Sequence, residues 1–178
     1  MKKSFGKSVF VGLSILAVCA MFLALQPTPK MLRVGTFDSR AIAIAYARSD
    51  LFAPYMRSLK EKYEKAKAEK DEKVIKKCEA EGPAQQQILH QQGFSIASVA
   101  DILEKVKDDL PKIAQEAGVD IIVSKWEVVH KNPSIEIVDV TSHLVKLFNP
   151  DEMTLKTIEG IQKQTPMPLL ELLVAKEE

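Results

Sequence analysis

The residues that could carry out catalysis are few and scattered along the chain. His90, His130 and His143 fall in three different predicted elements, and no two of them have the i, i+4 spacing of a helical metal-binding pair. Cys78 with His90 would supply two ligands, fewer than a tetrahedral zinc site requires. Asp38 follows a predicted strand within an Asp-Ser sequence, which is typical of a helix N-cap rather than of a catalytic acid. The sequence also lacks a phosphate-binding glycine loop, so we expect no enzymatic activity, no metal and no cofactor.

The composition limits the classes of protein to which the chain could belong. Its 178 residues are 46% hydrophobic and 28% charged, which is enough for one globular domain with its own core. Residues 1–30 contain four lysines and no acid, which leaves 21 basic against 24 acidic residues in 31–178. That balance excludes a strongly basic nucleic-acid-binding protein, so we expect no nucleic acid partner. The two cysteines, Cys19 and Cys78, are too few for a disulfide framework.

Residues 1–30 predict an export signal or a membrane anchor, followed by a linker. Lysines precede the uncharged apolar run Val9–Leu25, which is the pattern of a secretory signal peptide. Small residues at positions 18–20 offer a cleavage site, while an uncleaved anchor and a lipidated cysteine stay open as alternatives. The proline-containing Gln26–Pro29 is typical of a stiff linker. In each case residues 31–178 lie in the periplasm, either soluble after cleavage or anchored to the inner membrane.

Two segments of the chain, 31–50 and 118–148, predict a small β-body. Both contain short runs rich in Val and Ile that are bounded by turn residues, as strands are. The sheet has too few strands to cover its own apolar residues, so we expect the body to oligomerise. The predicted strands are Met31–Phe37, Val119–Ser124, Glu127–His130 as the hairpin partner of the second, and Ile135–Val138.

The segment between these two, 51–117, predicts a projecting antiparallel helical hairpin. The stretch Arg57–Lys77 holds nine basic and five acidic residues, which is typical of a solvated coiled-coil arm rather than of a core helix. We expect the tip at Gly82-Pro83, because arms of similar length result, with Gly93 as the alternative. The descending arm carries apolar residues in a heptad seam, made up of Ile96, Val99, Leu103, Val106, Leu110, Ile113 and Ala117.

Together these elements predict an α+β fold, in which a small β-sheet body carries a coiled-coil hairpin. Residues 149–178 add a C-terminal helix and a proline-rich tail. The helix begins at Asn149-Pro150 and ends near Gln164, where Pro residues break it. The sequence assigns no role to this C-terminal region.

The order of these elements resembles a known family. A strand followed by Asp38-Ser39, a long helical hairpin, the strand Gly118–Val123 and the helix start Asp139–Thr141 are similar in order and spacing to the OmpH/Skp family of periplasmic chaperones. The resemblance covers Leu32–Phe148. It implies a homotrimer whose hairpins surround a cavity and which holds unfolded outer-membrane β-barrel proteins without ATP.

If the chain is such a chaperone, its clients contact the inner faces of the arms near the tip. The charges of the two arms nearly cancel, so we expect apolar contact to outweigh electrostatic capture. The alternative function is a membrane-anchored envelope scaffold or adapter whose coiled-coil hairpin binds one specific partner. The candidate client-binding residues are the apolar Val74, Ile75, Ile88, Leu89 and Phe94 and the basic Lys70, Lys73 and Lys77.

Overall fold

The computed structural model describes residues 31–174 of the chain. The chain separates into two units, Met1–Met31 and Leu32–Glu178, and the second contains all the elements discussed below. The predicted signal or anchor and its linker lie outside the described residues. Among the residues that are described, none belongs to a helix both long and apolar enough to cross a membrane.

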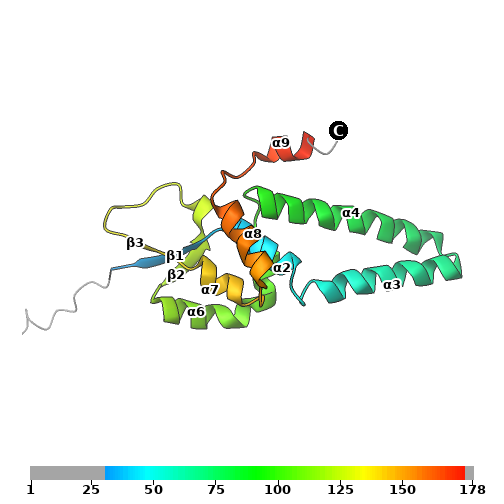
Figure 1. The fold of residues 1–178 in the computed structure, drawn as a ribbon, viewed down its shortest axis with the longest axis horizontal. Helices are drawn as coiled ribbons and strands as arrows, with labels where there is room; N and C mark the ends of the chain where they lie inside the picture. Colours follow the sequence, from blue (N-terminus) through cyan, green and yellow to red (C-terminus); the bar gives the residue numbers. More distant parts are fainter. Residues whose placement is uncertain (1–30, 175–178) are drawn as a thin grey trace, which may run out of the picture. The chain divides into compact units, whose positions relative to one another are not determined.

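The described residues combine helices with one small sheet, which confirms the predicted α+β class (Figure 1). The strands are β1 (Arg33–Phe37), β2 (Ile121–Ser124) and β3 (Glu136–Asp139). The α-helices are α2 (Ser39–Ala47), α3 (Ala53–Glu69), α4 (Glu72–Phe94), α5 (Ala100–Leu103), α6 (Leu110–Ala117), α7 (Thr141–Lys146), α8 (Glu152–Gln162) and α9 (Leu169–Val174). Two 3₁₀ helices, η1 (Glu104–Asp109) and η2 (Lys125–Glu127), lie between them.

The sheet is parallel, with β1 between β2 and β3. In the register, Val34 of β1 pairs with Ile121 on one side and with Ile137 on the other. The predicted hairpin partner Glu127–His130 is wrong, because this segment is not a strand: Glu127 ends the 3₁₀ helix η2, and residues 128–130 follow it without regular secondary structure. Instead, the Ser124 hydroxyl accepts a hydrogen bond from the Trp126 N–H at 3.3 Å and begins the η2 turn.

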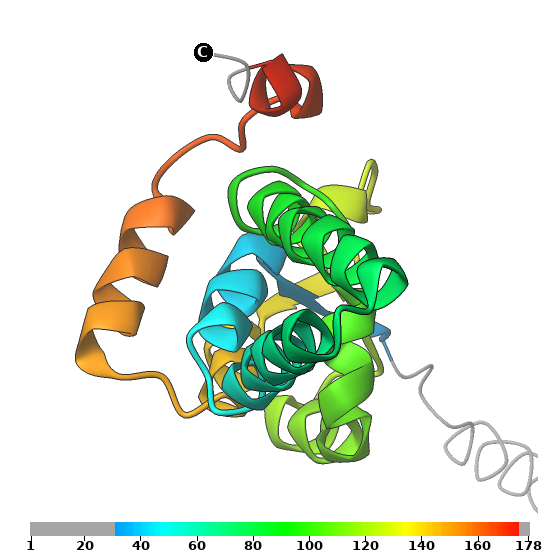
Figure 2. The same cartoon turned by 90° about the vertical axis from the view of Figure 1, so that its right-hand side faces the viewer.

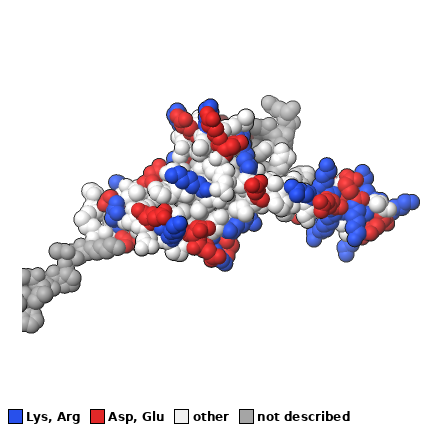
Figure 3. Space-filling model, turned by 60° about the horizontal axis from the view of Figure 1, so that its bottom comes forward, with Lys and Arg blue, Asp and Glu red and all other residues white. Residues whose placement is uncertain are grey.

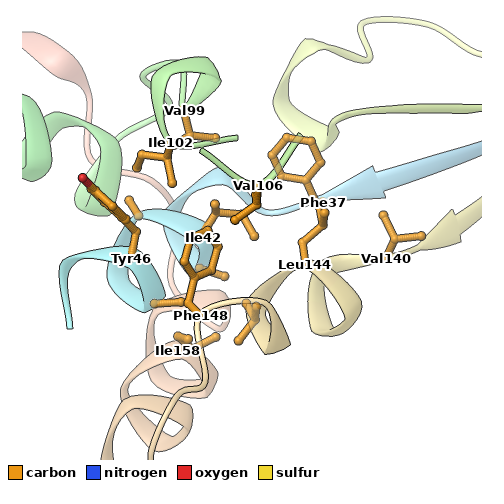
Figure 4. Packing of buried hydrophobic residues seen from close by; sticks show 14 of the residues in the cluster. Phe37, Ile42, Tyr46, Val99, Ile102, Val106, Val140, Leu144, Phe148 and Ile158 are labelled. Atoms are coloured by element: carbon orange, nitrogen blue, oxygen red, sulfur yellow. The ribbon is translucent and has the colours of Figure 1, made fainter. Parts of the chain in front are cut away.

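Helix α2 lies at the centre of the hydrophobic core. Its start is the predicted one, since the Asp38 side chain caps it by accepting a hydrogen bond from the Arg40 N–H at 3.0 Å. Most of its apolar side chains are buried, and Ile42 is fully inaccessible. Figure 4 shows Ile42 and Tyr46 surrounded by core residues from distant parts of the chain, among them Phe148. Strands and helices thus share one core that α2 organises.

The predicted heptad seam packs into this core rather than into a coiled coil. Of the seam residues, Val99, Val106 and Ile113 are buried in the same cluster as the residues of α2 and α7, whereas Ile96 is 57% exposed. The backbone leaves helical geometry at Val106, and Pro111 sits in the first turn of α6, so residues 95–117 fold back as short helices. An apolar stripe spaced three and four residues apart fits any helix with one buried side, and its partner here is the body. The long helical pair ends at Phe94, and the remaining residues of the predicted arm, 95–117, contribute to the common core.

Helices α3 and α4 pack side by side and extend away from the rest of their unit (Figures 1 and 2). The turn between them is at Lys70-Asp71, not at the predicted Gly82-Pro83, which lies inside α4. Lys70 adopts the left-handed conformation with φ 57°, and the Asp71 side chain caps α4 by accepting hydrogen bonds from two backbone N–H groups. Asp71 is therefore the N-cap residue that begins α4, and the expected tip at Gly82-Pro83 has no such N-cap side chain.

The C-terminal region completes the body. Helix α8 packs along α2, and its Ile158 is 5% exposed and belongs to the core. The Asp151 side chain caps α8 by accepting a hydrogen bond from the Thr154 N–H at 2.7 Å. Beyond α8 the chain passes to α9, which lies near α4 (Figure 2). A region to which the sequence assigned no role thus covers one side of α2.

Candidate functional site

A cleft of about 480 Å³ opens between α2, α4 and α8, at the base of the α3–α4 pair. Its volume is in the range of sites that bind drug-sized molecules or a few side chains of a peptide, about 300–1,000 Å³. Three elements that are far apart in the sequence form its walls. Its lining is made up of Ala43, Ile44, Ala47, Arg48, Gln86, Leu89, His90, Gly93, Phe94, Thr157, Gly160, Ile161 and Gln164.

Small residues give the cleft its depth. Ala43 and Ala47 are one helical turn apart on α2, so both face the same side of that helix. Gly93 on α4 and Gly160 on α8 contribute no side chain, and a Cβ at Gly160 would have no neighbour within 4 Å. The apolar walls are then supplied by larger side chains such as Leu89. The result is a mostly apolar slot whose lining includes two glycines and two alanines.

The rim of the cleft is polar. The Arg48 guanidinium donates a hydrogen bond to the Thr157 hydroxyl at 3.0 Å, and that hydroxyl donates to the Met153 carbonyl at 2.9 Å. His90, exposed on α4, adds a second group at the rim that can donate a hydrogen bond. An apolar slot with donors at its edge suits a chain segment that buries apolar side chains and presents carbonyl or carboxylate oxygens.

A buried ion cluster positions the end of α8 beside this cleft. Asp38 and Arg40 are both fully buried, and the Arg40 guanidinium donates to the Asp38 carboxylate through Nε at 3.1 Å and Nη2 at 2.9 Å. Lys125 approaches the same carboxylate at 2.8 Å. The Arg40 guanidinium also makes one hydrogen bond outside the ion cluster, in which its Nη1 donates to the Gln164 carbonyl at 2.9 Å. Trp126 closes the cluster, with the Arg40 guanidinium 5.0 Å from the centre of its ring.

The electrostatics of this cluster favour a structural role. Burial by itself raises the pKa of Asp38, but the hydrogen bonds from Arg40 and Lys125 outweigh that effect, so the pKa lies below its ordinary value. A carboxylate held ionised between two cations is a poor general acid or base near neutral pH. Its two oxygens are instead occupied by the contacts that fix α2, η2 and the end of α8. The cluster therefore positions one border of the cleft.

The structure divides the predicted client-binding residues between two places. Leu89 and Phe94 line the cleft, and Ile88, next to Leu89, is 44% exposed. Val74 and Ile75 lie near the outer turn and are half-buried. Fifteen residues of one helix separate Val74 from Leu89, a span of about 22 Å at 1.5 Å per residue. The exposed lysines Lys70, Lys73 and Lys77 belong to the outer group.

Charged side chains of both signs cover the outer end of the α3–α4 pair (Figure 3). The exposed face of this end therefore offers no uniform field to a charged partner. Between α3 and α4 a second hollow of about 250 Å³ is lined by Met56, Leu59, Lys60, Tyr63, Cys78, Glu79 and Pro83. Cys78 is buried there, whereas His90 lines the cleft twelve residues further along α4, so the two do not share a site.

Most of the cleft was missed by sequence reasoning. The sequence predicts its α2 wall as part of the body and its α8 wall as a C-terminal helix without a role, and glycines such as Gly160 give no apolar signal. One local signal was present, because Ala43 and Ala47 repeat at i, i+4 in an otherwise apolar helix. Arg40, the single charged residue within α2, was a second signal. A lone cation in an apolar helix must find a buried partner.

Comparisons with known proteins identify no relative. Neither a family model, nor a curated protein, nor a solved structure matches the chain. Across residues 31–174, no group of three or more His, Cys, Asp and Glu side chains is arranged to hold a metal ion. The cleft and the ion cluster that borders it are thus the features on which a function can be argued.

Proposed function

We propose that this chain binds polypeptides and acts as an ATP-independent holdase for unfolded outer-membrane proteins in the periplasm. The observation that carries the proposal is the apolar cleft at the base of α3–α4, into which Leu89 and Phe94 converge with α2 and α8. The resemblance to the OmpH/Skp chaperones supplies the class of client. The cleft supplies a surface on which an unfolded chain can bury apolar side chains.

The energetics of the cleft suit a holdase. Ile88 is 44% exposed and Phe94 is 45% exposed, so apolar surface beside the cleft stays in contact with water until a client covers it. Burying one client leucine or phenylalanine is worth about 1.5–3 kcal/mol before the cost of ordering the client is subtracted. A few such contacts give weak and replaceable binding. Such binding prevents aggregation and still releases the client without ATP.

We also propose that the chain assembles into a homotrimer through its sheet. The core covers one face of the sheet, the face of Ile122 and Val138. The other face carries Ile121, 44% exposed, and Ile137, 36% exposed, on either side of Val34. Parallel sheets in proteins are normally covered on both faces, so a neighbouring copy is the expected cover. Ile121→Lys would then convert the assembly to monomers in sedimentation velocity, whereas Ile88→Lys on α4 would not.

The experiment that tests the holdase proposal compares the two groups of predicted client residues. The full chain, carrying Leu89→Ser with Phe94→Ser, is added at equal molarity to a diluted, unfolded β-barrel protein, and aggregation is followed by light scattering. We expect the suppression of aggregation to fall severalfold. The matched control, Val74→Ser with Ile75→Ser, removes the same number of apolar side chains from the outer end of the same helix and is expected to change little.

Raising the salt concentration completes this test. If apolar contact dominates, suppression by the unchanged protein stays nearly constant up to about 0.5 M salt, where the Debye length is only a few ångströms. If salt abolishes the suppression of aggregation, and the double variant Leu89→Ser with Phe94→Ser suppresses aggregation as well as the unchanged protein, the outer lysines hold the client. The cleft would then not be the client site.

A membrane-anchored adapter is the second candidate, and the bounded size of the cleft favours it. A cleft of about 480 Å³ accommodates a short segment of one partner better than long stretches of many unrelated clients. N-terminal sequencing of the protein from cells separates the two candidates in part, because a retained Val9–Leu25 fits the anchored adapter. Capture of one protein at a fixed ratio, with no suppression of aggregation, would favour the adapter over the holdase.

A further inference from the structure

Helix α9 is an apolar segment that α4 contacts but covers only in part. Its six residues contain one charged side chain, Glu171, and four of its apolar residues are exposed. A helix of this length is not stable in water by itself, so its conformation depends on what covers it. The exposed fractions of the four residues are 48% for Leu169, 75% for Leu170, 40% for Leu173 and 58% for Val174.

The chain attaches α9 to the rim of the cleft. Gln164 lines the cleft, and its carbonyl accepts the hydrogen bond from Arg40 at 2.9 Å. Three residues later, the Met167 N–H donates to the carbonyl of Phe94, another lining residue, at 2.9 Å. Helix α9 begins two residues beyond this second attachment, and an extended chain of three residues reaches about 10 Å. The cleft is therefore within reach of Leu169 and Leu170.

The chemistry of the two surfaces matches. The cleft is lined by apolar and small residues, and the open space beside Gly160 leaves room for a branched side chain such as leucine. The one charge of α9 is the acidic Glu171, while the rim carries Arg48 and His90. Attachment at the rim also gives the segment an effective concentration in the millimolar range, which favours the cleft of the same chain over that of a second copy.

We propose that α9 is a ligand of the cleft of its own chain. The leucine-rich segment docks between α2, α4 and α8. The class of ligand that the cleft binds is then a short leucine-rich segment with an acidic residue. A polypeptide client must displace α9 before it binds, and this last statement rests on the proposed function. Docking of α9 itself does not.

Disulfide formation within one chain tests the docking. The full chain, with Cys19→Ser and Cys78→Ser, receives Gly160→Cys in the cleft and Leu170→Cys in α9. Gly160 is suitable because a Cβ there meets no other atom within 4 Å. A disulfide forms only when the two Cα atoms come within about 4.4–6.8 Å of one another, so mild oxidation reports docking. The matched control pairs Leu170→Cys with Gly82→Cys, which lies on α4 outside the cleft and is equally free of neighbours.

We expect the Gly160 pair to form a disulfide within the monomer at least tenfold faster than the Gly82 pair. Equal rates for the two pairs would overturn the proposal. A disulfide that joins two chains, seen as a covalent dimer, would also overturn it, because the occupant would then be a second copy.

A labelled peptide that copies residues 168–178 measures the competition directly. We expect the peptide to bind the full-chain triple variant, which carries Leu169→Ser, Leu170→Ser and Leu173→Ser together, about tenfold more tightly than it binds the unchanged chain. This ratio corresponds to a cleft that α9 occupies about nine-tenths of the time, because only the remaining tenth can then bind the peptide. Adding Gly160→Phe, which fills the slot, should abolish this binding, whereas Gly160→Ala should preserve it. Equal affinities for the unchanged chain and the triple variant would refute docking. If the two affinities are equal but the protein still suppresses aggregation, the holdase proposal stands and only α9 docking is refuted. If the triple variant binds more tightly but the protein does not suppress aggregation, α9 docking stands and the holdase proposal is refuted.

Discussion

Removal of the Arg40 guanidinium is expected to destabilise the body strongly. Arg40→Met keeps the length of the side chain and deletes two hydrogen bonds to Asp38 and one to the Gln164 carbonyl. Both partners of the ion pair are fully buried, so water cannot replace what is lost. Breaking a buried pair by deleting one partner typically costs about 3–5 kcal/mol. Lys125 remains 2.8 Å from Asp38, so the low end, about 3 kcal/mol, applies here.

Urea unfolding followed by circular dichroism measures this loss, and thermal unfolding should show a Tm lower by about 10 °C. The control is Lys163→Met, which removes a shorter ion pair, 2.6 Å to Glu159, whose side chains are 71% and 68% exposed. Exposed pairs contribute about 0–1 kcal/mol, so this variant should unfold almost as the unchanged protein does. If the two variants lost similar stability, burial would not be the property that makes the Asp38–Arg40 pair matter, and the reasoning would be refuted.

Three further predictions concern pH and packing. The pKa of Asp38 is lowered in the fold, so the ionised carboxylate stabilises the protein fully above the unfolded-state pKa of about 4, and this stabilisation is lost as the pH falls below that value. The free energy of unfolding should therefore drop more steeply below pH 4 in the unchanged protein than in Asp38→Asn. Parallel curves for the two proteins would contradict this. Gly35→Ala places a Cβ 3.1 Å from Val119 and 3.2 Å from Val140, and should lower the free energy of unfolding in urea by about 1–3 kcal/mol. Gly82→Ala, whose Cβ has no neighbour within 4 Å, should instead stabilise α4 by about 0.5–1 kcal/mol. Ile102→Ala should cost the whole body about 2–5 kcal/mol; a loss confined to the α3–α4 pair in hydrogen exchange would show instead that Ile102 does not belong to the common core.

The local elements could be predicted from sequence because their signals are local. The strand before Asp38, the cap that Asp38 provides, and the end of a helix at Gly118 all occur as expected, since each depends on residues within one turn. Gly118 has φ +63°, the left-handed geometry that favours glycine at a helix end. Local signals thus gave the boundaries of these elements closely.

The partners of these elements could not be predicted in the same way. The seam through Val99, Leu103 and Val106 has the spacing of a coiled coil, but the same spacing fits a helix packed on a body, and only the fold decides between them. The direction of β2 relative to β1 is likewise set by the long crossover and not by the composition of either strand. The cleft depends on the absence of side chains at Gly93 and Gly160, brought together from positions far apart, and no local pattern announces such a gap.

The central position of β1 has a consequence for the order in which the chain folds. Arg33 forms hydrogen bonds with Asp120 and Glu136, which are 87 and 103 residues further along the chain. Helices α3 and α4 are joined by a two-residue turn and can pair as soon as both are made. The first strand, by contrast, must wait for a strand that begins 103 residues after Arg33, and the long loop that this pairing closes makes the step slow. A chain cut short before Glu136 would therefore leave β1 without its second neighbour, and the sheet of an emerging chain would stay incomplete until β3 has been made.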